Sequence, residues 1–226
     1  MKRTACFFFA VIVVVLLLPV SASAEQVYGC ASNDEMKIAL TFDDGPHPRV
    51  TNKILDVLSK YGVRATFFMV GENVKNYPDT AKRVAREGHE IGNHTYTHPH
   101  IKNMDAHELL TEMAKCDKAI KEVTGVSSVK LFRPPEGVID SAVKAISSEK
   151  GYSIILWRID TRDWAGSSVY DIKSNIERNV QTGDIILMHD YISKKCHTVE
   201  AIDVIIPMLL ERGYKFVTVS ELIGEE

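Results

Sequence analysis

The chain has 226 residues, enough for one domain with a sizeable hydrophobic core. Hydrophobic residues make up 45% and charged residues 25%, the ordinary balance of a globular protein. The formal net charge is −3, and the sequence has no block of lysine or arginine, which argues against nucleic acid as a partner.

The N-terminus has the pattern of a secretory signal peptide, predicted over residues 1–24. Two basic residues at 2–3 precede an apolar run at 7–20 that is short for a membrane span. Ala-Ser-Ala at 22–24 provides a small-residue cleavage site. We therefore expect a protein of the cell envelope or one secreted from the cell, with no stable membrane insertion after cleavage. An uncleaved N-terminal anchor is the alternative.

Strand-like and helix-like stretches alternate along the chain after a short N-terminal segment at 25–35. Strands are predicted at residues 38–42, 65–70, 90–93, 129–132, 154–159, 185–188 and 216–219. Helices are predicted at residues 50–61, 79–87, 105–123, 139–149, 169–180 and 199–211, followed by a short terminal helix. Alternating βα units predict a mostly parallel α/β sheet, open or closed into a barrel, and the lack of a linker predicts one catalytic domain at 36–226.

Two motifs supply a candidate metal site. His94 and His98 are four residues apart, a spacing that predicts one shared face of a helical turn. Asp43 and Asp44 follow a predicted strand, and Gly45-Pro46 after them predicts the loop that lets both carboxylates reach one ion. Two imidazoles and one carboxylate form a facial ligand set with open positions, and the second carboxylate is free to act as a base. The constellation suggests metal-assisted hydrolysis.

Five motifs in the same order resemble those of the polysaccharide deacetylase family, the NodB-type carbohydrate esterases of family four. They are Thr-Phe-Asp-Asp-Gly-Pro at 41–46, His-Thr-Tyr-Thr-His-Pro at 94–99, Arg-Pro-Pro-Glu-Gly at 133–137, Asp-Thr-Arg-Asp-Trp at 160–164 and Leu-Met-His at 187–189. The resemblance implies a single-domain distorted (β/α) barrel with the NodB homology fold, a divalent metal, and removal of N- or O-acetyl groups from glycans.

The same resemblance implies that Asp44, His94 and His98 are the metal ligands. Histidine and carboxylate suit zinc, and cobalt, nickel or iron fit the same set. The alternative is that Asp44 caps the following turn and that the histidines are ordinary polar groups. The four-residue spacing and the neighbouring Asp pair argue against this alternative.

The resemblance also implies catalytic roles. Asp43 would be the general base, held in place by Arg133. His189 would be the general acid, oriented by Asp163, because its unperturbed pKa near 6.5 suits proton delivery to a departing amine. Taken alone, Arg133 and Asp163 also fit a structural ion pair.

The remaining implied roles belong to the substrate pocket. The backbone N–H of Glu136 would contact the oxyanion, and Trp164, Leu187 and Pro134 would contact the substrate, although Leu187 also fits ordinary core packing. Glu136 departs from the family, which usually has Tyr at this position. Any residue except proline supplies the N–H, so the departure affects substrate fit rather than chemistry.

The function expected from these residues is hydrolysis of a linear amide C–N bond, with N-acetyl groups removed from N-acetylglucosamine units of peptidoglycan, chitin or chito-oligomers and acetate released. One alternative is an O-acetyl esterase acting on acetylxylan. A second is a non-catalytic glycan-binding module, which predicts the loss of a ligand or of the base, and the sequence has lost neither.

Overall fold

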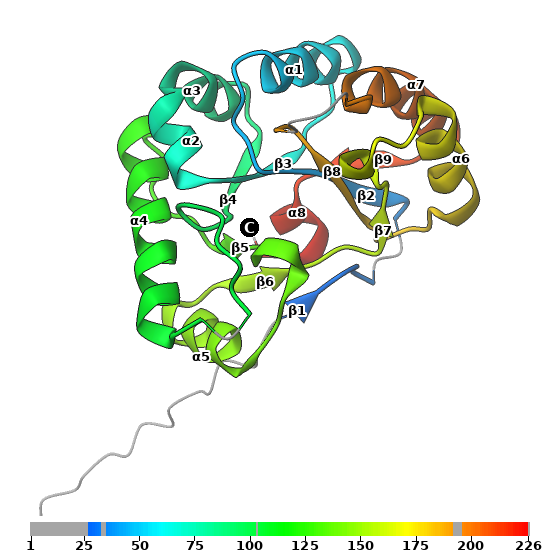
Figure 1. The fold of residues 1–226 in the computed structure, drawn as a ribbon. Coiled ribbons are helices and arrows are strands. Elements are labelled where there is room, and N and C mark those ends of the chain that lie inside the picture. Colours follow the sequence, from blue (N-terminus) through cyan, green and yellow to red (C-terminus); the bar gives the residue numbers. More distant parts are fainter. Residues whose placement is uncertain (1–26, 33–34, 103, 192–195, 226) are drawn as a thin grey trace, which may run out of the picture.

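The computed structural model of the protein describes residues 27–32, 35–102, 104–191 and 196–225 (Figure 1). The predicted signal peptide at 1–24 lies outside the described residues. Within the described ranges, no helix combines the length and the apolar character needed to cross a membrane.

The described residues form a sheet of nine strands in which every strand pair is parallel. The strands are β1 (Val27–Tyr28), β2 (Lys37–Asp43), β3 (Thr66–Met69), β4 (Glu90–Asn93), β5 (Leu131–Phe132), β6 (Ser153–Ile155), β7 (Ile159–Asp160), β8 (Ile185–His189) and β9 (Lys215–Val217). Their spatial order is β1-β6-β5-β4-β3-β2-β8-β7, and β9 pairs with β2.

The helices surround this sheet, with one exception (Figure 1). They are α1 (Val50–Tyr61), α2 (Gly71–Asn76), α3 (Pro78–Arg86), α4 (Ala106–Thr124), α5 (Ser141–Lys150), α6 (Val169–Asn179), α7 (Thr198–Glu211) and α8 (Val219–Ile223), with 3₁₀ turns η1 (Pro135–Gly137) and η2 (Asp163–Ala165). Helices α1 to α7 lie outside the curled sheet, whereas α8 lies within its outline.

The curled sheet is an incomplete barrel. β1 and β7 end the strand order, and an antiparallel bridge between Cys30 and Asp184 connects the residues after β1 to the start of β8. The predicted distorted (β/α) barrel of mostly parallel strands is therefore confirmed.

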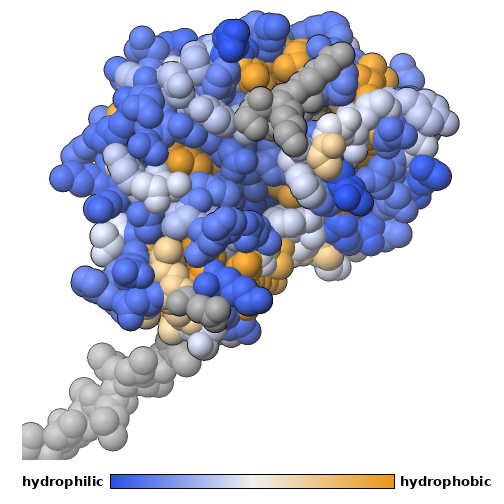
Figure 2. Space-filling model, viewed as in Figure 1, coloured by the Kyte–Doolittle hydropathy of each residue, from blue (hydrophilic) through white to orange (hydrophobic). Residues whose placement is uncertain are grey.

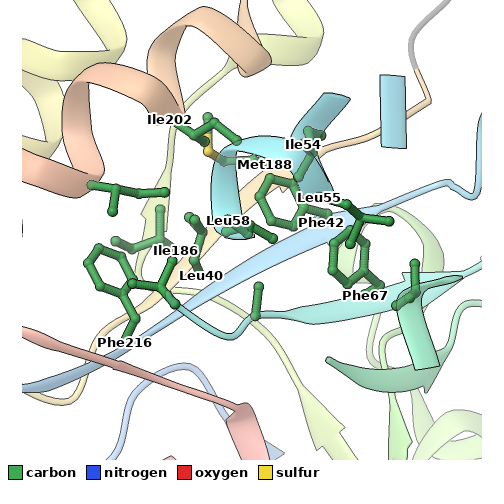
Figure 3. Packing of buried hydrophobic residues seen from close by; sticks show 14 of the residues in the cluster. Leu40, Phe42, Ile54, Leu55, Leu58, Phe67, Ile186, Met188, Ile202 and Phe216 are labelled. Atoms are coloured by element: carbon green, nitrogen blue, oxygen red, sulfur yellow. The ribbon is translucent and has the colours of Figure 1, made fainter. Parts of the chain in front are cut away.

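Alternation along β2 explains both the core and the position of the site. Leu40 and Phe42 point outward and pack with α1 and α7 in the largest apolar cluster (Figure 3). Ala39 belongs to the cluster inside the barrel, and residues 41 and 43 share its face because strand side chains alternate with a period of two. This register places Asp43 at the mouth of the barrel interior.

The opposite end of the barrel is closed by α8. The backbone N–H of Val219 donates to Thr66 Oγ1 at 2.9 Å, and that of Ser220 donates to Glu90 Oε2 at 3.2 Å. Thr66 and Glu90 are the first residues of β3 and β4. Helix α8 therefore covers the N-terminal ends of these strands, and the cleft described below opens at the C-terminal ends.

Several predicted elements differ from the structure. The strand predicted at 154–159 is two strands, β6 and β7, because the chain changes partners between them. The N–H of Leu156 donates to Tyr28 O of β1, whereas that of Arg158 donates to Ile185 O of β8. The strand predicted at 216–219 ends at Val217, since Thr218 caps α8 with its side chain.

Candidate active site

The motifs converge because parallel strands end at the same edge of the sheet. Asp43 pairs with His189 in the register of β2 and β8, and Asn93, which precedes His94, pairs with Phe132, which precedes Arg133. These strand ends surround a cleft of about 500 Å³. The residues lining the cleft are Asp43, Asp44, His94, His98, Glu136, Trp157, Asp160, Trp164, Leu187 and His189.

The three predicted metal ligands lie together. One ligand atom from each of Asp44, His94 and His98 lies within 4.8 Å of the other two. Asp44 Oδ1 is 3.4 Å from His94 Nε2 and 3.3 Å from His98 Nε2. His94 Nδ1 lies 2.7 Å from the carbonyl oxygen of Arg133, to which it can donate, leaving Nε2 as the acceptor that faces Asp44. This donor set fits a divalent transition metal.

The predicted helical turn at the two histidines is wrong. His94 and His98 lie in a loop after β4, and their ring centroids are 5.0 Å apart. Thr95 and His98 have φ angles of 67° and 54°, in the left-handed region. Two left-handed residues fold the loop back so that both rings face Asp44 without a helix.

The backbone also adopts a left-handed conformation at Asp44, the second of the two adjacent carboxylates. Asp43 is the last residue of β2, and Asp44 has a φ angle of 75°. The turn that was expected at Gly45-Pro46 therefore begins one residue earlier, at Asp44. Asp43 is placed by β2 itself, and its Oδ2 lies 3.8 Å from His94 Nε2, next to the candidate ligand set.

Arg133 holds Asp43 from inside the barrel. Its Nη1 donates to Asp43 Oδ1 at 2.7 Å and to Thr41 Oγ1 at 2.8 Å. Its other nitrogens donate to the carbonyl oxygens of Ile155 and Leu156, and the guanidinium carbon lies 4.0 Å from the ring centroid of Phe68. Because each guanidinium nitrogen donates at least one hydrogen bond and the side chain is fully buried, Arg133 fixes one orientation of the Asp43 carboxylate.

His189 is held from the other side by Asp163. Its Nδ1 lies 2.8 Å from Asp163 Oδ1, and its backbone N–H donates to Asp163 Oδ2 at 2.8 Å. Burial alone would lower the pKa of His189, but the hydrogen bond and charge of Asp163, with the charges of Asp43 and Asp44, raise the pKa to about 9. The imidazole is therefore protonated at neutral pH.

The predicted substrate-contacting residues are only partly in the cleft. Trp164 and Leu187 line it, and Trp164 is 49% exposed. Pro134 is buried and is not among the residues lining the cleft. Glu136 lies on the rim with a φ angle of 58°, and no acceptor in the described part of the chain takes its backbone N–H.

Two lining residues were not assigned a role from the sequence, Trp157 and Asp160. Trp157 lies in the break between β6 and β7, which the sequence presented as one continuous strand. Asp160 is the first residue of the Asp-Thr-Arg-Asp-Trp motif and lies at the end of β7. Its position at a strand end was the signal that could have identified it as a cleft residue.

The fold and the candidate ligand set define a class of protein: a parallel α/β barrel with a two-histidine, one-carboxylate site at the ends of its strands.

The sequence profile of the family described as polysaccharide deacetylase matches residues 31–155. A peptidoglycan-N-acetylglucosamine deacetylase of Bacillus cereus is 43% identical over 193 residues, which cover 84% of this chain and 90% of that protein. A chitooligosaccharide deacetylase of a Bradyrhizobium species is 34% identical over 206 residues, covering 86% of this chain and 94% of that one.

Solved structures agree with the sequence comparison. The crystal structure of a peptidoglycan N-acetylglucosamine deacetylase superimposes with a TM-score of 0.84 at 36% identity, covering 89% of this chain and 94% of that one. The protein belongs to the polysaccharide deacetylase family.

Proposed function

We propose that the protein is a metal-dependent deacetylase that removes N-acetyl groups from N-acetylglucosamine units of peptidoglycan or chito-oligomers and releases acetate. The observation that carries this proposal is the convergence of Asp44, His94 and His98 beside the carboxylate of Asp43, whose Oδ2 lies 3.8 Å from His94 Nε2. The names of the similar proteins support the substrate class.

The proposed ligands are Asp44, His94 and His98, with zinc as the expected ion. A divalent cation held there would polarise the acetyl carbonyl and acidify a water molecule. Asp43, fixed by Arg133, accepts the proton of the attacking water.

The other side of the cleft serves the leaving group. His189, kept protonated by Asp163, gives its Nε2 proton to the departing amine nitrogen. The backbone N–H of Glu136, which has no acceptor among the described residues, donates to the developing oxyanion. Trp164 and Leu187 form the apolar wall for the acetyl methyl group.

Acetate release from peptidoglycan, chito-oligomers and acetylxylan tests the proposal. We expect a chelator to abolish release from the first two substrates and an added divalent metal to restore it. Asp43→Asn should retain metal binding and lower the rate by about 10²–10⁴-fold, the usual contribution of general base catalysis.

Two results would contradict the proposal. Acetate release that survives complete metal removal would exclude the metal site from catalysis. Release from acetylxylan alone would replace the amide substrate with an ester, and the O-acetyl esterase would become the function.

A further inference from the structure

The loop between the two candidate histidine ligands is held through its backbone carbonyls by α2. The N–H of Gly71 donates to Thr95 O at 3.0 Å, and the N–H of Glu72 donates to Tyr96 O at 2.9 Å. These donors belong to the first turn of α2, where backbone N–H groups have no partner within the helix. A Cβ atom at Gly71 would lie 2.5 Å from the ring of Tyr96, so α2 and the loop are in close contact.

The N–H groups of the same loop are held by Glu112, on α4. A single carboxylate oxygen, Oε2 of Glu112, accepts from the N–H of Tyr96 at 3.0 Å and from the N–H of Thr97 at 2.8 Å. The hydroxyl group of Thr97 donates to the same oxygen at 3.1 Å. Successive backbone N–H groups that converge on one anionic oxygen form a strong, directional contact.

The loop needs such contacts because its conformation is locally unfavourable. Thr95 and His98 both adopt left-handed φ angles, which β-branched and bulky side chains seldom occupy. Strained residues of this kind persist where surrounding structure determines them. Here the loop carbonyls accept hydrogen bonds from α2, and the loop amides donate to Glu112 of α4, along the segment that separates the two imidazoles.

We propose that Glu112 is a positioning residue for the metal site, holding residues 96–97 so that His94 and His98 present their Nε2 atoms to one ion. The inference rests on the proposed metal site and goes beyond it, because Glu112 is not among the residues that line the cleft. Glu112 acts through the loop backbone and contacts neither the ion nor the substrate.

Metal titration of the metal-free protein tests this role by a readout that does not depend on turnover. Calorimetry with Zn²⁺ or Co²⁺ should show Kd at least about tenfold weaker for Glu112→Ala than for the unsubstituted protein, the size typical of lost outer contacts at metal sites. Glu112→Gln should recover most of the affinity, because its amide oxygen still accepts from both N–H groups.

Glu108→Ala is the matched control. It removes the same charge one turn earlier on α4, from an exposed side chain, and should bind metal with the unsubstituted Kd. If Glu112→Ala does not fold, judged by circular dichroism of the metal-free protein, Glu112→Asp replaces it. The shorter side chain keeps the charge but cannot reach all three donors, so its affinity should also fall.

The outcomes separate this inference from the proposed function. A folded Glu112→Ala or Glu112→Asp variant with unchanged metal Kd would overturn the positioning role and leave the deacetylase proposal intact. Absence of metal binding by the unsubstituted protein would overturn both. Metal binding that weakens as expected, in a protein that releases no acetate, would support the positioning role and refute the proposed function.

Discussion

The alkaline limit of the proposed reaction depends on the protonation of His189. Burial opposes its charged form, but Asp163, Asp43 and Asp44 outweigh burial and raise the pKa to about 9. A general acid must be protonated before it acts, so the rate should persist up to about pH 9 and fall above it. Asp163→Asn removes the negative charge that raises the pKa of His189. The alkaline limb of the pH–rate profile should therefore move to lower pH.

The pH–rate profile of acetate release from a chito-oligomer, measured for both proteins, checks this prediction. Thr198 also donates to Asp163 Oδ2, at 2.6 Å, and thermal unfolding should be followed in parallel to show that Asp163→Asn is folded. An alkaline limb at the same pH in both proteins would mean that His189 is not the acid, or that Asp163 does not set its pKa.

Glu136 was interpreted from the sequence as a departure from the residue usual in the family, and its place among the residues that line the cleft makes it a candidate for substrate selection. Its carboxylate is half-exposed and lies 2.7 Å from the exposed His100 imidazole. Replacement by Tyr removes a negative charge from a cleft that Asp43, Asp44 and Asp160 also line. Glu136→Tyr should therefore raise the relative rate on anionic glycans by up to about fivefold, the effect of one exposed charge interaction.

Competition between an anionic peptidoglycan fragment and a neutral chito-oligomer measures that change, with metal Kd as the second readout. The metal Kd should stay the same. Glu136→Gln removes the charge without adding a ring, so a shift seen in Glu136→Tyr but absent in Glu136→Gln would assign the selectivity to shape rather than to charge. Equal relative rates in all three proteins would remove Glu136 from substrate selection.

At the scale of elements, the sequence predicts best where the local pattern decides the structure. Helix α1 has buried residues at helical spacing and ends at Gly62, whose φ of 64° is the left-handed cap that glycine favours, so its bounds were predicted correctly. Helix α2 was missed because it has six residues and buries two, Gly71 and Val74, which leaves no periodic pattern to recognise.

Contacts between distant segments explain the other differences. The break between β6 and β7 depends on a change of partner strand from β1 to β8. Both partners are distant from residues 153–160 in the sequence, so the local pattern cannot predict the break. Ordered motifs predicted the candidate site residues, and most of these line the cleft. Arg133 and Asp163 lie beneath it and contact Asp43 and His189, whereas Pro134 is buried and does not line it. The loop at 94–98 could not be predicted, because its two left-handed residues depend on α2 and Glu112.

At the scale of the whole molecule, the barrel separates the part that stabilises the fold from the part that carries chemistry. Helix α8 and the inner apolar cluster fill the end where the strands begin, and the cleft lies where they end. The face seen in Figure 2 is largely hydrophilic, with hydrophobic residues in separate patches. The candidate ligands come from two segments, after β2 and after β4, that meet only when the barrel is formed.

This arrangement couples metal binding to global stability, because the unfolded chain does not bring Asp44 to the two histidines. A metal at 100 times its Kd should stabilise the fold by about 2.7 kcal/mol, which corresponds to a rise in Tm of about 5–10 °C for a domain of this size. Asp44→Asn should lose most of this rise, whereas Asp160→Asn, which alters a cleft residue outside the ligand set, should keep it. Thermal unfolding with and without Zn²⁺ measures the rise, and an equal rise in the Asp44→Asn protein would show that the stabilising ion binds elsewhere.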